Sequence, residues 1–122
     1  MLILENCADV QVTDARIGFL RAANSTVRIV NSQIRDGVDA SNSRLELTAG
    51  FVGGSPPLVL YATSVDAAGT RFEADDVIAA NRGSVPVTLR LSVSEISPAS
   101  AAPRYVHDIL RLAPGQDWKV PD

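Results

Sequence analysis

The sequence predicts an all-β fold, a single-stranded parallel β-helix (solenoid) of about five coils, and three observations carry this prediction. First, an eight-residue unit with the pattern apolar-x-apolar-x-x-small-x-apolar recurs at residues 10–17, 27–34, 45–52, 65–72 and 89–96. Second, its starting positions 10, 27, 45, 65 and 89 are separated by 17, 18, 20 and 24 residues, a period that is typical of solenoids. Third, the apolar residues at the start of each unit alternate with a period of two, as in a strand, and not with the period of a helical repeat.

Each position of the unit has an expected place in a coil. The sixth position is always small, which suits an inward-facing residue at a tight corner; it is Ala15, Ser32, Gly50, Thr70 or Ser94. The last position is always apolar and is expected to return to the core; it is Ile17, Ile34, Val52, Phe72 or Ile96. A second apolar cluster in each coil predicts one further strand, at residues 19–22, 38–40, 58–62 and 77–79.

Turn-forming residues separate these strands, at positions 24–25, 42–43, 63–64 and 82–84. Asn24 and Asn42 each lie three residues before their unit, a place that Cys7 and Ala62 take in other coils. We therefore expect a short asparagine stack at this turn, with Cys7 as a small buried member of the same column.

Two insertions lengthen individual coils, at residues 53–57 and 82–86. Both contain proline, which cannot donate to a sheet ladder, so we expect both to project as loops. Inserted loops on one face of a repeat fold are where ligands usually bind.

The repeat ends at residue 96, and we assign residues 1–96 to the coils and residues 97–122 to a linker and a C-terminal cap. Tyr105, Ile109 and Leu112 are spaced for one face of a short helix, with a Pro-Gly stop after it. We expect this helical or irregular segment to cover the last coil, because a solenoid end exposes unpaired strand edges. One more strand over the same residues is the alternative.

Composition bounds the function classes. A chain of 122 residues with 46% hydrophobic content is the size of one domain. The net charge is −3 and no basic face is implied, so we do not expect a nucleic-acid partner. The lone Cys7 cannot form an internal disulfide, and no Cys/His cluster suits a structural zinc ion, so we assign no cofactor and no metal.

No membrane partner is expected either, because no apolar run approaches the roughly 20 residues of a membrane span. The N-terminus also lacks the basic start and long apolar region of a signal peptide. The chain enters the first repeat almost at once, which fits either a very small protein or a piece of a longer one. We expect a cytoplasmic location in the first case and leave an extracytoplasmic one open in the second.

Coils near 20 residues, with short strands bounded by Asn, Ser and Gly, resemble the right-handed parallel β-helix of the pectate-lyase-like superfamily over about residues 2–96. That superfamily includes polysaccharide lyases, polygalacturonases, viral tailspikes and non-catalytic spacer domains, so the resemblance implies a fold and no single activity. Of the segments that polygalacturonases share, the chain has only Asp75-Asp76 and lacks Gly-His-Gly and Arg-Ile-Lys. Glycosidase activity of that type is therefore not expected. Bactofilins, which are cytoskeletal β-helices that polymerise end to end, are a more general likeness.

The outward position between the first two apolar residues of each unit predicts a column of side chains on one face of the solenoid: Gln11, Arg28, Glu46, Asp66 and Arg90. We expect ion pairs between Arg28 and Glu46 and between Asp66 and Arg90, because these residues fall on neighbouring strands. Glu46 and Asp66 then form a like-charge contact that could bind calcium or an acidic sugar. A solvated charge ladder is the plainer interpretation.

Two further sets of polar residues are weighed in the same way. Asp75 and Asp76 form the most acidic local run, but no EF-hand spacing accompanies them, and a solvated turn is the plainer interpretation. His107 is the only histidine, and adjacent Asp108 would not face it on a helix, so we expect a surface or cap histidine.

Phe51 is the clearest departure from the pattern, because the other units place Arg16, Gln33, Arg71 or Glu95 at its outward position. An exposed aromatic ring on a β-helix face could stack on a sugar or pack against a partner chain. Cover by the 53–57 loop or by the tail is the alternative.

We therefore expect a non-catalytic structural or interaction module, with no catalytic residue assigned. One alternative is a carbohydrate-binding or carbohydrate-processing β-helix with a groove beside Phe51, Tyr61 and the Pro56-Pro57 loop. Another is a self-assembling scaffold, a homo-oligomer formed through an exposed end or face. The candidate ligand-binding residues are Phe51, Tyr61, Glu46, Asp66, Asp75 and Asp76.

Overall fold

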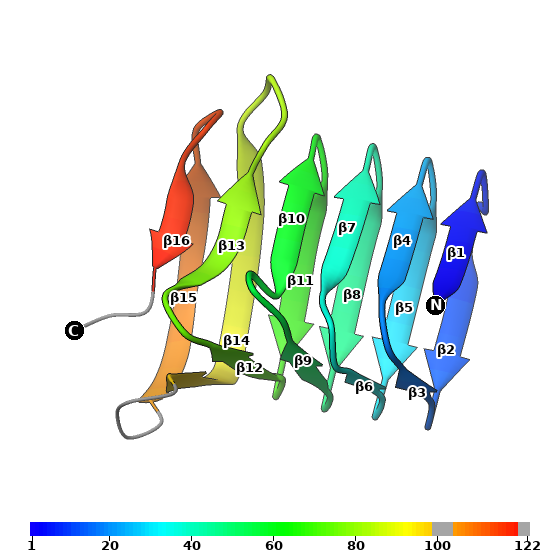
Figure 1. Ribbon diagram of the computed structural model, residues 1–122, viewed down its shortest axis with the longest axis horizontal. Helices are drawn as coiled ribbons and strands as arrows, with labels where there is room; N and C mark the ends of the chain where they lie inside the picture. The colour runs from blue at the N-terminus through cyan, green and yellow to red at the C-terminus, as the bar shows by residue number, and fades with distance from the viewer. Residues whose placement is uncertain (99–103, 120–122) are drawn as a thin grey trace.

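The computed structural model describes residues 1–98 and 104–119, and these form a parallel β-solenoid of about five turns (Figure 1). The described part of the chain contains no helix. It therefore has no helix long and apolar enough to cross a membrane. The strands of successive coils lie side by side in two parallel sheets, which confirms the predicted fold class.

The first sheet has one strand from each coil and one from the tail. Its order is β1 (Leu2–Glu5), β4 (Leu20–Ala23), β7 (Val38–Ser41), β10 (Leu58–Tyr61), β13 (Val77–Asn81) and β16 (Asp117–Lys119). The strands β4, β7, β10 and β13 are the ones predicted from the second apolar cluster. Successive side chains of a strand point to opposite faces, so every second residue points into the core. In β10 these residues are Leu58 and Leu60, which are both buried.

The second sheet contains the eight-residue units. One row consists of β2 (Val10–Thr13), β5 (Thr26–Val30), β8 (Arg44–Thr48), β11 (Ser64–Ala68) and β14 (Val87–Pro98). A second row of short strands consists of β3 (Arg16–Ile17), β6 (Gln33–Ile34), β9 (Phe51–Gly53) and β12 (Arg71–Ala74). The long strand β14 joins both rows, because its first part pairs with β11 and its last part with β12.

The register matches the predicted repeat. The first positions of the five units stack in one column: Val10, Val27, Leu45, Val65 and Leu89. The last positions are buried as expected, with Ile34, Phe72 and Ile96 at 0% exposure. The core of the solenoid is therefore built from the same inward positions, repeated coil after coil.

Buried hydroxyl groups hold the corner between the two sheets together. Ser25 Oγ accepts a hydrogen bond from the amide of Cys7 (3.0 Å), and Ser43 Oγ accepts one from the amide of Ser25 (3.2 Å). Thr63 Oγ1 then accepts one from the amide of Ser43 (3.2 Å). Each hydroxyl also donates to a carbonyl two residues earlier, as Ser25 does to Ala23 (2.8 Å). This hydroxyl ladder supplies partners for corner amides that sheet hydrogen bonds do not reach.

The predicted place of Cys7 in the asparagine column is wrong. Asn6 occupies it, and Asn24 Nδ2 donates to Asn6 Oδ1 (3.2 Å) in an exposed position. Cys7 instead aligns with Ser25 and is only partly buried. The first turn is one residue longer than the second. Cys7 therefore lies three residues before its unit, whereas the aligned Ser25 lies two residues before its own. The column itself is set by backbone conformation, since Asn6, Asn24, Asn42 and Ala62 all have positive φ angles of 48–55°.

The helical cap is also wrong. Residues 104–112 form β15 (Arg104–Leu112), which pairs antiparallel with β14, and β16 pairs antiparallel with β13. The strand alternative is the correct one, because the last coil offers unpaired hydrogen-bonding groups on both sheets and two strands satisfy them. Figure 1 shows β15 and β16 beside the last coil. The linker residues 99–103 lie outside the described residues.

The two insertions form loops between strands, but the first does not simply project. A Cβ atom on Gly54 would lie 3.0 Å from Gly37 Cα, so this loop lies directly against the preceding coil. The second loop, residues 82–86, extends beyond the neighbouring turns (Figure 1). It is tied down by buried Asn81, whose Nδ2 donates to the carbonyls of Val85 (2.9 Å) and Leu112 (3.0 Å).

Candidate functional site

One candidate site lies on the row of short strands, around Phe51 at the start of β9. Strand pairing places Phe51 between Gln33 and Arg71, as the sequence pattern predicts. The side chain points away from the core and is half-buried, whereas its neighbour Val52 is 1% exposed. The alternation of a strand therefore puts an aromatic ring on the outer surface at this one coil.

Gly53 makes room for the ring. It follows in the next outward position of β9, opposite Glu73 of β12. A Cβ atom at Gly53 would lie 3.2 Å from Phe51 Cε1 and 3.3 Å from Phe51 Cζ. The ring thus lies over the position where any other residue would carry a side chain. This contact gives Phe51 part of the cover by the 53–57 loop that was the alternative expectation for it.

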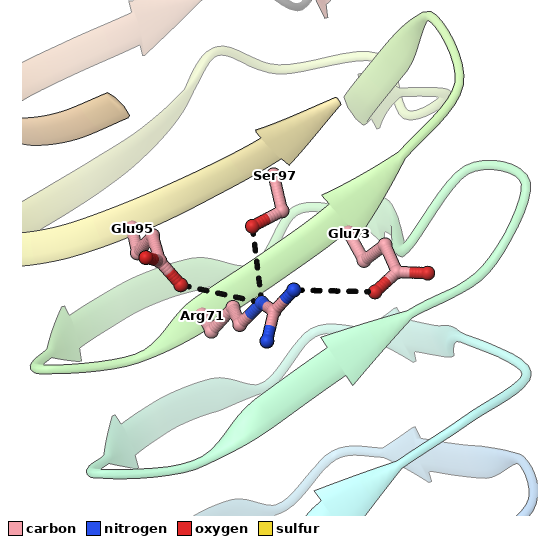
Figure 2. Close-up of polar contacts among 4 residues, drawn as sticks. All are labelled: Arg71, Glu73, Glu95 and Ser97. Carbon is pink, nitrogen blue, oxygen red and sulfur yellow. Dashed lines mark hydrogen bonds and ion pairs between the residues drawn. The ribbon is translucent and has the colours of Figure 1, made fainter. Parts of the chain in front are cut away.

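Arg71 covers the ring from the next coil and is itself held by an ion-pair network (Figure 2). Its guanidinium carbon lies 5.9 Å from the centre of the Phe51 ring, within the range of a cation–π interaction. Arg71 Nε lies 3.2 Å from Glu95 and donates to Ser97 Oγ (3.0 Å), and Nη2 lies 3.8 Å from Glu73. The guanidinium is therefore fixed beside the ring by three polar partners.

Three hollows meet around Phe51 and the 53–57 loop. The largest, of about 570 Å³, is lined by Arg35, Asp36, Phe51, Gly53, Gly54, Ser55, Glu73, Ala74 and Asp75. A second of about 460 Å³ shares Phe51 and also includes Arg71, and a third of about 230 Å³ shares Ser55 and Asp75. The largest hollow shares lining residues with each of the other two, and we call the three together the Phe51 groove.

The groove combines one aromatic ring with four carboxylates and two arginines. The ion-paired side chains remain open to solvent, with Arg71 at 50% and Glu73 at 54% exposure. The carboxylate can accept hydrogen bonds from hydroxyls and the guanidinium can donate them, but neither group is held in a desolvated catalytic pocket. Within residues 1–98 and 104–119, no group of three or more His, Cys, Asp and Glu side chains could hold a metal ion.

The structure gathers only part of the predicted ligand-binding set here. Phe51 and Asp75 line the groove, and Asp76 lines its end beside Pro56. Tyr61 is the last residue of β10 in the first sheet, 37% exposed, and lies across the coil from the short strands (Figure 1). The structure therefore does not bring Tyr61 beside Phe51.

Sequence reasoning missed several residues of the groove. Asp36, which was not among the candidate residues, lines the same hollow as Asp75. Arg71 was assigned to the same column as Phe51, so its approach to the ring could have been anticipated from strand register alone. The role of Gly53 could not have been anticipated, because it depends on the direction in which the phenyl ring points.

Glu46 and Asp66 lie elsewhere, on the outer face of the longer strands of the second sheet. The predicted column is confirmed, with Arg28, Glu46, Asp66 and Arg90 in register on β5, β8, β11 and β14. Arg28 Nε lies 3.1 Å from Glu46, so this predicted ion pair is confirmed. The predicted pair of Asp66 with Arg90 is wrong, since the ion pairs found among the described residues do not include it. Glu46 also forms an ion pair that was not predicted, with Arg44 at 3.6 Å.

His107 is exposed on β15, and strand geometry keeps it apart from adjacent Asp108, whose carboxylate accepts from the amide of Ile109 (2.8 Å). Cys7 Sγ contacts the carbonyl of Glu5 (3.4 Å). Neither residue lines the Phe51 groove.

Comparisons of the chain with protein-family models, with curated proteins and with solved structures find no match.

Proposed function

We propose that this chain is a non-catalytic structural or interaction module. The observation that supports this proposal is the exposure of the charged side chains in the Phe51 groove. The charged residues that line it are all solvent-exposed, and Arg71 forms an ion pair with Glu73, so these groups do not converge on a shielded reacting centre. Catalysis by charged groups depends on their being held in a site from which water is excluded.

A hydrolysis and lyase assay tests this proposal. The protein is incubated with neutral and acidic polysaccharides, and reducing ends and unsaturated products are measured. We expect neither to exceed the level of a heat-denatured sample. Cleavage that disappears in any one of Asp75→Asn, Asp76→Asn, Glu46→Gln, Asp66→Asn or His107→Gln would overturn the proposal.

A second candidate function is carbohydrate binding in the Phe51 groove. It is favoured by the coincidence of an aromatic ring, a glycine that frees space beside it, and the Ser55-Pro56 border of the inserted loop. Aromatic rings contact the apolar face of sugars, and neighbouring carboxylates such as Asp75 accept hydrogen bonds from sugar hydroxyls.

A glycan array followed by titration calorimetry tests this second candidate. Phe51→Ala should abolish binding and Phe51→Tyr should preserve it, while Tyr61→Ala serves as a matched control because it removes an exposed aromatic outside the groove. An array without hits would argue against the candidate, as would equal losses in Phe51→Ala and Tyr61→Ala.

Self-assembly is a third candidate, supported by the first coil. Its inward residues Leu2, Leu4 and Val12 are only partly buried, and the pairings among the described residues leave one edge of β1, β2 and β3 open. Open strand edges and partly exposed core favour association. Light scattering at increasing concentration tests this, and a monomer at the highest concentration would count against it.

The finer classification is also part of this proposal. The repeat pattern supports membership of the pectate-lyase-like superfamily of right-handed parallel β-helices, as one of its non-catalytic spacer or interaction domains. A homologous sequence that belongs to this superfamily would support the assignment.

A further inference from the structure

We propose that the outer face of the second sheet carries a binding site for a small hydroxylated anion, formed by Arg44, Ser64, Asp66, Thr88 and Arg90. These residues line a cleft of about 500 Å³ that crosses β8, β11 and β14. The cleft is separate from the Phe51 groove, with which it shares no lining residue. The inference therefore holds or fails independently of carbohydrate binding at Phe51.

Strand register explains why these side chains meet. Ser64 pairs with Arg44, and Asp66 pairs with Arg90, so both pairs lie on adjacent strands about 4.8 Å apart. Thr88 precedes Leu89, which pairs with Val65, so its side chain lies beside that of Ser64 on the same outward face. Figure 1 shows β8, β11 and β14 as neighbours.

The polar groups of the cleft are largely without protein partners. Among the described residues, Arg90 and Asp66 make no ion pair, although they face each other across neighbouring strands. Likewise, the hydrogen bonds of residues 1–98 and 104–119 do not include the hydroxyl of Ser64 or Thr88. Arg44 has only a 3.6 Å contact with Glu46, which lies closer to Arg28. Two guanidinium groups and two hydroxyls thus have donors to spare on one cleft.

The charge of the cleft selects the ligand class. Two of the lining residues are arginines and one is a carboxylate, and Arg111 of β15 adds a positive charge opposite Thr88. Glu46 lies in register beside Asp66, but its charge is offset by the ion pair with Arg28. Guanidinium groups bind carboxylates and phosphates with paired hydrogen bonds. Asp66 repels an oxyanion but accepts a hydrogen bond from a hydroxyl, so it favours an anion that carries hydroxyl groups over a bare one. Sugar phosphates and sugar acids share this chemistry.

Titration calorimetry and NMR chemical-shift perturbation on the intact chain test the proposal. The probes are glucose 6-phosphate, gluconate, inorganic phosphate and glucose. We expect glucose 6-phosphate, gluconate or both to bind at least about tenfold more tightly than glucose, because only they engage the arginines. The two anions distinguish a phosphate site from a carboxylate site. Binding should weaken as salt is added, because the cleft is exposed.

Variants assign the binding to this cleft. Arg90→Gln and Arg44→Gln should each raise the dissociation constant of the tighter anion about tenfold, the expected effect of losing a charge-assisted hydrogen bond. Asp66→Asn should increase the affinity for inorganic phosphate. It should also reduce the difference in affinity between inorganic phosphate and the hydroxylated anions. Arg21→Gln is the matched control, since Arg21 is an exposed arginine on β4 of the first sheet.

Three results would overturn the proposal. They are no binding of either hydroxylated anion, binding of glucose as tight as that of the anions, or a loss of affinity in Arg21→Gln equal to that in Arg44→Gln and Arg90→Gln. Circular dichroism of each variant verifies the fold. All four substituted residues lie on the surface or are half-buried, so loss of structure is not expected to obscure the result.

Discussion

Single hydroxyl groups decide how the corners of the coils are held. At the corner between the sheets, Ser25, Ser43 and Thr63 each accept from the amide of the preceding coil. At the second corner, Ser32 accepts from the amide of Ala15 (3.0 Å), and Thr70 donates to the carbonyl of Leu47 (3.1 Å). A small polar residue at such a corner therefore serves hydrogen bonding as well as size.

Replacing Thr63 with valine tests this role of the hydroxyl. Thr63→Val keeps the shape but leaves the buried amide of Ser43 without a partner, which should cost about 1–3 kcal/mol in urea unfolding. Thr63→Ser retains the hydroxyl, as the aligned Ser25 and Ser43 do, and should cost less. Equal losses in the two variants would show that the methyl group matters and the hydrogen bond does not.

Backbone conformation at the second corner is equally regular. The fifth position of every unit has a positive φ angle, and the residues are Asp14, Asn31, Ala49, Gly69 and Val93. Asn, Asp and Gly adopt this region readily, whereas a β-branched residue is strained there. Val93, with φ of 46° and 64% exposure, is the residue least suited to its position.

Val93→Asn should therefore stabilise the protein by about 1 kcal/mol, because the left-handed conformation costs an ordinary residue about that much. Thermal and urea unfolding measure the change. Val85→Asn is the control, since Val85 is also an exposed valine but is not among the positive-φ residues. A gain of the same size at Val85 would point to reduced surface hydrophobicity instead.

At the scale of elements, the C-terminal strands β15 and β16 complete the hydrogen bonding of the last coil. They join different sheets, and both run antiparallel to their neighbours. Val106, Leu110 and Leu112 face the core, while Tyr105 and Ile109 are 74% and 63% exposed. The tail is thus continuous with the two sheets of the solenoid.

Two alanine substitutions distinguish this strand from the helix that the sequence pattern suggested. Leu112→Ala should destabilise the protein by about 2–5 kcal/mol, because Leu112 is 4% exposed and belongs to the core. Ile109→Ala should change stability by less than about 0.5 kcal/mol, because its side chain faces solvent. On a helix the two residues would share the buried face, so comparable losses in urea unfolding would contradict the strand.

At the scale of the whole molecule, the two ends of the solenoid differ. The C-terminal coil is extended by antiparallel strands on both sheets, whereas the first coil is paired on one side only among the described residues. Each coil of a solenoid contacts only its neighbours, so local stability follows the number of neighbours.

Hydrogen exchange should reveal this difference as a gradient along the chain. Amides of β7 and β8, which have a strand on each side, should exchange at least about tenfold more slowly than those of β1 and β2. Exchange measured by mass spectrometry at low protein concentration provides the test. Uniform protection along the chain would indicate one cooperative unit or a partner on the first coil.

Much of the fold could be predicted from the sequence, because each coil repeats the same local pattern. The alternation of Val27, Arg28 and Ile29 was enough to predict which side chains point inward and which outward. The register between coils followed from aligning the units, and it correctly placed Phe51 beside Arg71 and Arg28 beside Glu46.

The candidate site was less predictable, because it depends on atoms outside the repeat. Asp36 and Asp75 belong to different connections, and only the path of the chain brings them to one hollow. Asp66 and Arg90 are in register as predicted, yet register alone does not determine where their side chains point.

The sequence by itself determined the inward and outward faces of the coils, since a strand leaves each side chain only two directions. Only the tertiary structure decided the form of the tail. The spacing of Tyr105, Ile109 and Leu112 suits a helix, while that of Val106, Leu110 and Leu112 suits a strand, so local pattern left both open. The unpaired hydrogen-bonding groups of β13 and β14 favour the strand, because β16 and β15 pair with them directly.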